Sequence, residues 1–157
     1  TEAEPLSEEL GAVGKVVRSN PEVLNVLTAA GFLPVVACVA GDRQGRIYNV
    51  NADSMAVACG TGFAAERLIF LTDVDGVRGA AGERLPTLTP AVCRQLINDG
   101  VATGGMEAKL TSAMEALAGG IGQVVIAPGA MERAAARILA GEAVGTALKP
   151  EEDATHA

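Results

Sequence analysis

Two short apolar runs constrain the fold more than any other feature of the sequence. Residues 67–71 (RLIFL) and 123–127 (QVVIA) are almost wholly apolar and do not alternate with polar residues. That pattern is typical of strands buried on both faces. The residues between the two runs contain helix patterns over 90–98 and 106–118. Because strands separated by helices usually pair in parallel, the sequence predicts an α/β protein, an αβα layered sandwich with a mainly parallel sheet.

The remaining elements follow from turn and capping residues. Asn20 and Pro21 open a helix that Gly31 ends, and Thr89 caps the helix over 90–98. Residues 33–40 form an apolar run that predicts another buried strand, and a glycine-containing turn then leads into 46–50 as its hairpin partner. Further strands are expected over 11–17 and 143–148, and further helices over 52–61 and 130–139.

Composition narrows the class of protein. The 157 residues are 49% hydrophobic, mostly Ala, Val, Leu and Ile, which suits a sheet covered by helices. The net charge of −7 argues against nucleic acid or an anionic membrane as a partner. Three cysteines without metal-ligand spacing indicate buried, reduced thiols in a cytoplasmic protein. The chain begins at Thr1 without an initiator Met, so we expect either a processed chain or a piece of a longer protein.

The segment 48–53 (YNVNAD) places polar side chains where packing residues are expected. In an extended segment, Asn49, Asn51 and Asp53 would lie on one face. Alternatively, Asn51 caps the following helix and Asp53 lies in its first turn. A capped turn accounts for Asn51 but not for the two flanking polar residues. The sequence therefore predicts a binding site here.

Two other places could carry chemistry. Thr72 and Asp73 follow the apolar run 67–71, at the carboxyl edge where open α/β sheets bind ligands, although a hydrogen-bonded turn explains them equally well. Gly104 and Gly105 open a helix that carries Lys109 about one turn inside. Glycines at a helix N-terminus leave backbone N–H groups available to an anion, but a simple turn with a surface lysine has the same pattern.

The order of these motifs is more specific than any one of them. The stretches NVNAD (49–53), LTDVDGV (71–77), GGMEAK (104–109) and VGT (144–146) together resemble the amino acid kinase family. The resemblance extends from Leu10 to Leu148. It is strongest to the members that phosphorylate the side-chain carboxylate of N-acetyl-L-glutamate with ATP and Mg²⁺, a step of arginine biosynthesis. It implies an incomplete amino acid kinase fold.

The resemblance also assigns roles to individual residues. In the site for the acid substrate, Asn49 matches the asparagine that holds the acetylglutamate. Asn51 belongs to the same motif and either binds substrate or supports the site as a helix cap. Asp53 matches the aspartate that orients the catalytic lysines. Lys109 matches the catalytic lysine that contacts the transferring phosphoryl group and the nucleotide phosphates. The remaining nucleotide-binding positions are Thr72, Asp73, Gly76, Gly105 and Met106. No residue is expected to bind a metal directly.

The family also has a glycine-rich loop with a second lysine, and an arginine that binds the acid substrate. Neither is found in these 157 residues, so we expect residues 1–62 to be the end of the acid-binding lobe, 63–149 the nucleotide-binding lobe and 150–157 a polar tail. We expect the chain alone to be inactive, with apolar surface left for the missing half or for another copy in a homo-oligomer. A related carboxylate kinase, such as one acting on an aminoadipate derivative, and a non-catalytic nucleotide-binding regulatory module remain alternatives.

Overall fold

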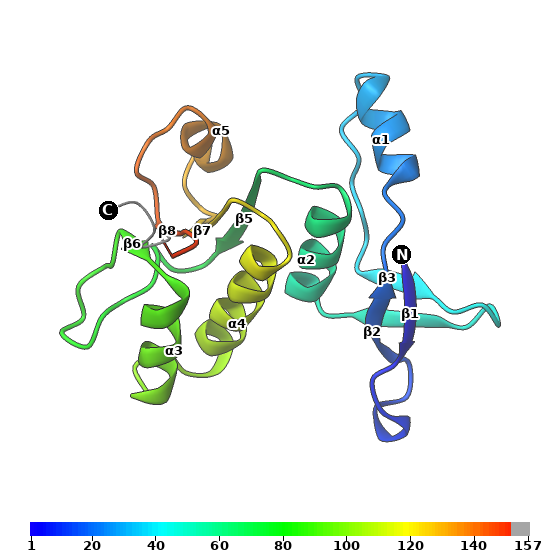
Figure 1. Ribbon diagram of the computed structural model, residues 1–157, viewed down its shortest axis with the longest axis horizontal. Coiled ribbons are helices and arrows are strands. Elements are labelled where there is room, and N and C mark those ends of the chain that lie inside the picture. The colour runs from blue at the N-terminus through cyan, green and yellow to red at the C-terminus, as the bar shows by residue number, and fades with distance from the viewer. Residues whose placement is uncertain (152–157) are drawn as a thin grey trace, which may run out of the picture. The chain divides into compact units, whose positions relative to one another are not determined.

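The computed structural model describes residues 1–151, which divide into two compact units. Unit 1 comprises Thr1–Ala65, and unit 2 begins at Glu66 (Figure 1). The polar tail expected over 150–157, which includes His156, lies outside the described residues except for Pro150 and Glu151. The acid-binding and nucleotide-binding roles given to the two lobes stay predictions.

Unit 1 is built on a small closed barrel with strand order β1-β2-β4-β3. Its elements are β1 (Glu2–Pro5), η1 (Glu8–Leu10), β2 (Val13–Arg18), α1 (Glu22–Ala29), β3 (Val39–Gly41), β4 (Ile47–Val50) and α2 (Ala52–Gly62). The hairpin expected to end at Val50 is confirmed, because β3 and β4 pair antiparallel. Strand β1 is not among the elements that the sequence predicted. It pairs antiparallel with β2 and parallel with β3, which closes the barrel.

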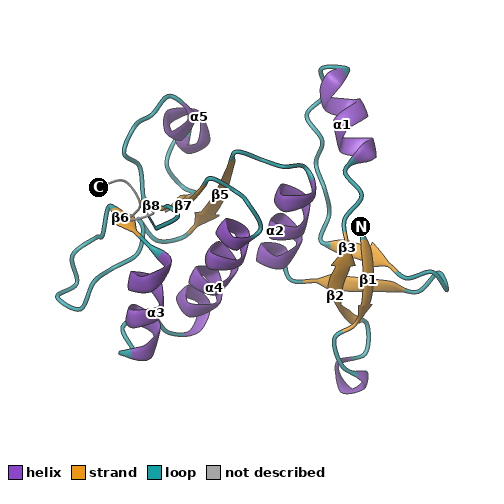
Figure 2. Ribbon diagram, in the orientation of Figure 1, coloured by secondary structure: helices purple, strands orange, loops and turns teal. Residues whose placement is uncertain are grey.

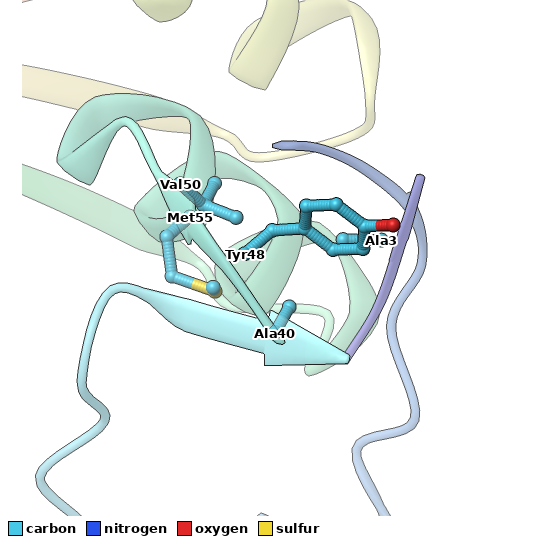
Figure 3. Close-up of a cluster of buried hydrophobic side chains, with 5 residues drawn as sticks. All are labelled: Ala3, Ala40, Tyr48, Val50 and Met55. Atoms are coloured by element: carbon cyan, nitrogen blue, oxygen red, sulfur yellow. The ribbon is translucent and has the colours of Figure 1, made fainter. Parts of the chain in front are cut away.

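A cluster of buried side chains fills the space between the barrel and α2 (Figure 3). Its members come from β1, β3, β4 and α2: Ala3, Ala40, Tyr48, Val50 and Met55. Tyr48 and Val50 are two residues apart, so both side chains lie on the inner side of β4. The Tyr48 side chain lies so close to β2 that a Cβ at Gly14 would stand 2.6 Å from the Tyr48 Cβ. Glycine at position 14 is therefore required by the packing of Tyr48.

The hydroxyl of Tyr48 is held by Asp42 in the β3–β4 turn. It donates to Asp42 Oδ2 at 3.0 Å, and Arg46 Nε donates to the same oxygen at 2.6 Å. The backbone N–H groups of Gln44 and Arg46 donate to the other carboxylate oxygen. Burial by itself would raise the pKa of Asp42, but these hydrogen bonds outweigh it and lower that pKa from 3.8 to about 2. The carboxylate thus joins the turn to the core of unit 1.

The prediction of a strand over 33–40 is largely wrong. Only Val39 and Ala40 belong to a strand, residues 32–37 have no regular structure, and the side chains of Leu33 and Val35 are 89% and 93% exposed. An apolar, β-branched run favours a strand, but a strand also needs a hydrogen-bonding partner, and 33–37 lie outside every ladder of the described residues. The preceding helix α1 likewise buries none of its residues, and Figure 1 shows it standing clear of the barrel strands.

Unit 2 has a four-stranded sheet in the order β5-β7-β8-β6, with helices on both sides (Figure 2). Its elements are β5 (Arg67–Thr72), β6 (Thr87–Leu88), α3 (Pro90–Asn98), α4 (Gly104–Ala118), β7 (Gln123–Pro128), α5 (Ala134–Leu139) and β8 (Thr146–Leu148). The α/β class and its layers are confirmed. The sheets are mixed, because β7 and β8 pair antiparallel while β5–β7 and β6–β8 pair parallel, and the strands of unit 1 form a separate sheet.

Strand β7 lies inside the sheet and buries side chains on both faces, as its sequence predicted. The same prediction is wrong for β5, which lies at the edge of the sheet: Phe70 is buried, but Leu71 is 52% exposed. Val125 and Ala127 of β7 pack with Ile138 of α5, and Ile69 of β5 joins them. Side chains that alternate with these, such as Val124 and Ile126, are fully buried on the other face. The helix expected over 130–139 begins only at Ala134, because Arg133 takes a left-handed conformation (φ 56°) that interrupts a helix.

The loop after β5 is tied to β8 by a buried hydroxyl. Thr146 Oγ1 accepts from the N–H of Val77 at 2.8 Å and donates to the carbonyl of Leu85 at 2.6 Å. Gly76 lies directly against this hydroxyl, with φ of 142°, and a Cβ at this position would stand 2.7 Å from Thr146 Oγ1. Residues 79–83 form a turn that is closed by the Gly79 N–H, which donates to the Glu83 carbonyl.

The cysteines are free, as expected, but only Cys93 is buried. Cys38 and Cys59 are half-buried against the Tyr48 cluster, so the expectation of three buried thiols is wrong for these two. Burial raises the pKa of the Cys93 thiol to about 11. None of the helices described here is long and apolar enough to span a bilayer.

The low pKa of Asp42 predicts how unit 1 responds to acid. Because the folded-state pKa is lowered, the stabilisation is present above pH 3.8 and is lost as the pH falls through about 2. We expect the urea midpoint of the chain, followed by circular dichroism, to drop across this window. The urea midpoint of Asp42→Asn should fall less steeply with pH, because the substitution removes the titrating carboxyl group. An equally steep fall of the midpoint in the two proteins would contradict the role given to Asp42.

Gly76→Ala is expected to destabilise unit 2 by about 1–3 kcal/mol, because it combines a strained φ with a contact against Thr146 Oγ1. Urea unfolding measures the loss. Gly105→Ala is the matched control, since no heavy atom lies within 4 Å of a Cβ placed there. Its free energy of unfolding should stay within about 0.5 kcal/mol of that of the unaltered chain. A free energy of unfolding for Gly76→Ala as high as that of the control would overturn the packing explanation.

Candidate functional site

The candidate acid-binding residues of unit 1 surround the start of α2. Asn51 is the N-cap, and its Oδ1 accepts from the backbone N–H groups of Asp53 at 3.0 Å and Ser54 at 3.2 Å. Asp53 is half-buried in the first turn, where a carboxylate is favoured by the helix dipole. The capped-turn alternative is therefore correct for these two residues. The capping bonds account for Asn51, and its role toward substrate stays a prediction.

Asn49 differs from Tyr48 and Val50, the residues on either side of it, because its side chain is exposed. Its backbone is fixed, since its N–H donates to Ala12 at 2.8 Å and it is paired with both β2 and β3. Tyr48 and Val50 on either side point into the core. Strand alternation therefore turns Asn49 outward on a rigid backbone. This is a suitable position for a residue that binds a ligand.

Thr72 and Asp73 stand at the carboxyl end of β5, as predicted. Thr72 Oγ1 donates to Asp73 Oδ1 at 3.0 Å, and the N–H of Gly129 donates to the Thr72 carbonyl at 2.7 Å. The second bond holds the end of β5 beside the end of β7. Asp73 is exposed. The turn explanation accounts for the local hydrogen bonds, and the edge position remains the one where α/β sheets bind ligands.

The glycine-opened helix begins two residues earlier than expected, at Gly104 with φ of 56°. Thr103 occupies the N-cap position without a side-chain hydrogen bond to the first turn. Gly105 is exposed and has no neighbour within 4 Å of its Cβ direction. Met106 is half-buried beside them. The start of α4 is thus open and uncapped by its own side chain, which is the condition for binding an anion at a helix N-terminus.

Lys109 lies one turn further along α4, above an aromatic ring. Its Nζ is 5.0 Å from the centroid of Phe70 on β5. Phe70 is 5% exposed and stands two residues before Thr72. The contact therefore places the ammonium group of Lys109 at the carboxyl-terminal half of β5. Sequence reasoning singled out Lys109 but missed Phe70, whose only signal is an aromatic residue within an otherwise aliphatic run.

Gly76, predicted to bind nucleotide, has an evident structural role. Its contact with Thr146 Oγ1 requires glycine whether or not a ligand is present. Arg84, which the sequence reasoning also missed, donates to the Gly145 carbonyl and holds the same loop. The motif 144–146 therefore contributes a hydroxyl that organises the loop after β5. Any contact of Gly76 with nucleotide stays a prediction.

Comparison with known proteins bears on the family of the chain. The model of the amino acid kinase family matches residues 2–128. The chain is 63% identical over 147 residues to an acetylglutamate kinase from Solibacter usitatus (strain Ellin6076), a match that covers 94% of this chain and 57% of that enzyme. An acetylglutamate kinase from Psychrobacter arcticus (strain DSM 17307 / VKM B-2377 / 273-4) is 39% identical over 146 residues, covering 92% of this chain and 48% of the enzyme. The chain thus spans about half the length of these curated relatives.

Among solved structures, the fold is similar to N-acetylglutamate synthase from Neisseria gonorrhoeae complexed with coenzyme A and L-arginine. The TM-score is 0.86 at 22% sequence identity, over 94% of this chain and 36% of that one. At this identity the similarity concerns the fold alone. The family model and the identity to the Solibacter usitatus enzyme go further, and together they show that the chain belongs to the amino acid kinase family.

Proposed function

We propose that this chain is part of an acetylglutamate kinase, which transfers the γ-phosphoryl group of ATP to the side-chain carboxylate of N-acetyl-L-glutamate in arginine biosynthesis. The observation that carries the proposal is the 63% identity to the Solibacter usitatus acetylglutamate kinase across 94% of this chain. The reaction forms a bond between a carboxylate oxygen and the γ-phosphorus and breaks the bond from that phosphorus to the β,γ-bridging oxygen. ADP leaves with the electron pair of the broken bond.

The residues of unit 2 support the nucleotide side of this proposal. Phosphoryl transfer to a carboxylate brings several negatively charged oxygens together, so catalysis depends on positioning and on neutralising charge. The open start of α4 with Gly105 offers backbone N–H groups, and Lys109 offers a cation one turn further on. Thr72 and Asp73 at the end of β5, with Gly76 and Met106, would complete the nucleotide site. Lys109 would contact the transferring phosphoryl group.

Unit 1 would supply the acid side. The exposed side chain of Asn49 would hold the acetylglutamate, with Asn51 fixing the start of α2. Asp53, in the first turn of α2, would orient lysine ammonium groups without taking part in bond formation. In the proposal, catalysis also needs the glycine-rich loop and second lysine of the family. The chain by itself is therefore expected to bind nucleotide without turning over substrate.

Mg²⁺ would enter with the nucleotide and neutralise charge on its phosphates. Residues 1–151 contain no group of three or more His, Cys, Asp or Glu side chains arranged to hold a metal. In kinases, Mg²⁺ is usually held mainly by phosphate oxygens and water. We propose no protein ligand for it. A cytoplasmic location belongs to the same proposal, because three free cysteines suit a reducing compartment.

Isothermal titration tests the assignment of nucleotide and acid sites. We expect the 157-residue chain to bind Mg-ATP, and Lys109→Ala to weaken that binding at least tenfold, because a charge-assisted contact to phosphate contributes about 1.5–3 kcal/mol. Glu115→Ala, an exposed residue near the other end of the same helix, is the control for removal of a charge and should bind normally. In a complete enzyme, Lys109→Ala should lower kcat by about 10²–10³ with the fold intact.

Titration with N-acetyl-L-glutamate discriminates between the alternatives. Binding of ATP alone fits a nucleotide unit with an incomplete acid site, and phosphorylation of acetylglutamate by the chain alone would refute the expected inactivity. An aminoadipate derivative bound in preference to acetylglutamate would favour the related carboxylate kinase. Absence of ATP binding would remove the nucleotide assignment altogether.

We further propose that the apolar surface of unit 1 formed by α1 and residues 32–36 is covered in the complete enzyme by the remainder of the polypeptide. Val23, Val26 and Phe32 are each more than 60% exposed, and Leu33 and Val35 more than 85%. An exposed surface of this kind usually marks an interface. The run 33–37 has the composition of a buried strand but no ladder partner among the described residues, and the matched enzyme extends well beyond the aligned part.

Leu33→Glu/Val35→Glu tests this surface. The part of the Solibacter usitatus enzyme outside the match, produced separately, should bind the unaltered chain in a titration. The double variant should weaken binding more than tenfold, since burial of each side chain contributes about 1.5–3 kcal/mol. Leu139→Glu, 66% exposed on α5, is the control and should bind normally. Normal binding by the double variant would contradict the proposal, and self-association lost in that variant would instead assign the surface to a second copy.

A further inference from the structure

The contact between Lys109 and Phe70 joins the two layers of unit 2 that meet at the carboxyl end of β5. The ammonium nitrogen lies 5.0 Å from the ring centroid, within the range of a cation–π interaction. Phe70 is 5% exposed, so its ring is fixed by its surroundings. Lysine has a long flexible side chain, and this contact gives it one preferred position above the sheet.

Phe70 is the one aromatic residue of β5. Its neighbours Leu68, Ile69 and Leu71 are aliphatic. Ile69 joins the cluster against α5, so strand alternation directs Phe70 to the opposite face, where α4 carries Lys109. What the ring adds beyond burial is its negative π face toward the ammonium group.

We propose that Phe70 is a positioning residue for Lys109, an inference that rests on the proposed function. The ring contacts the ammonium group from the sheet side. A lysine that is already in place loses less side-chain entropy when it binds a phosphate group. Phe70 therefore raises affinity for the polyphosphate of ATP through Lys109 and does not itself touch the reacting atoms.

A double-mutant cycle on ATP affinity, measured by isothermal titration of the 157-residue chain, tests the proposal. Phe70→Leu should weaken ATP binding about two- to fivefold, the size of an exposed cation–π interaction. In the Lys109→Met background, the same substitution should have no effect. Phe70→Tyr keeps the ring and should restore affinity. Phe63→Leu, an aromatic residue of unit 1, is the matched control and should bind like the unaltered chain.

A comparison of AMP with ATP distinguishes the positioning role from a purely structural role of Phe70. Because AMP lacks the β- and γ-phosphates, its affinity should be the same with Phe70 and with Leu at this position. Equal losses for AMP and ATP, or equal losses with and without Lys109, would overturn the positioning role. Absence of ATP binding by the unaltered chain would overturn the proposed function and, with it, this role, so the two failures are distinguishable.

Nuclear magnetic resonance tests the placement of the side chain without a ligand. The ε-methylene protons of Lys109 should be shifted upfield by the ring current of Phe70. The shift should persist in Phe70→Tyr and disappear in Phe70→Leu, with circular dichroism confirming that each variant is folded. Unchanged Lys109 resonances in Phe70→Leu would show that the ring does not hold the lysine, and the inference would fail.

Discussion

The parallel ladder between β5 and β7 determines where the candidate nucleotide residues of unit 2 lie. Six residue pairs, from Arg67–Gln123 to Thr72–Pro128, bring the carboxyl ends of both strands to one edge. The same register directs Ile69 toward α5 and Phe70 toward α4. A slip of one residue would exchange these faces, because side chains alternate along a strand. Phe70 would then leave Lys109, and Ile69 would leave the α5 cluster.

Several residues with the family pattern have structural roles that are sufficient to explain them. Asn51 caps α2, Gly76 allows the loop to approach Thr146, and Thr146 itself bonds both sides of that loop. A functional site built on such residues is rigid before any ligand arrives, which is how a preorganised site neutralises charge efficiently. Asn49 and Lys109 are different. Asn49 is exposed on a fixed strand, and the ammonium group of Lys109 lies against the Phe70 ring.

Elements marked by local signals were predicted well. The helices capped by Thr89 and Asn51 begin where the capping residues indicate, and β7 buries both faces as its unbroken apolar run predicts. The similar run in β5 lies at the edge of the sheet and is only partly buried. Predictions that depended on distant partners were less successful. Residues 33–37 have strand composition but no ladder, and the acidic stretch Glu2–Pro5 forms a strand because β2 and β3 pair with it. Pairing is a property of two segments, and one segment cannot reveal it.

The sequence alone determined the local conformations, the class of fold and the list of candidate residues, because capping, turn and burial patterns act within a few residues and the order of motifs identifies the family. Only the tertiary structure decided that the strands form two mixed sheets, that Tyr48 and Asp42 share a half-buried hydrogen bond, and that Phe70 lies beneath Lys109. These features join residues 6 to 39 positions apart or depend on the register of whole strands. Such contacts are set by packing and strand pairing, which no local pattern encodes.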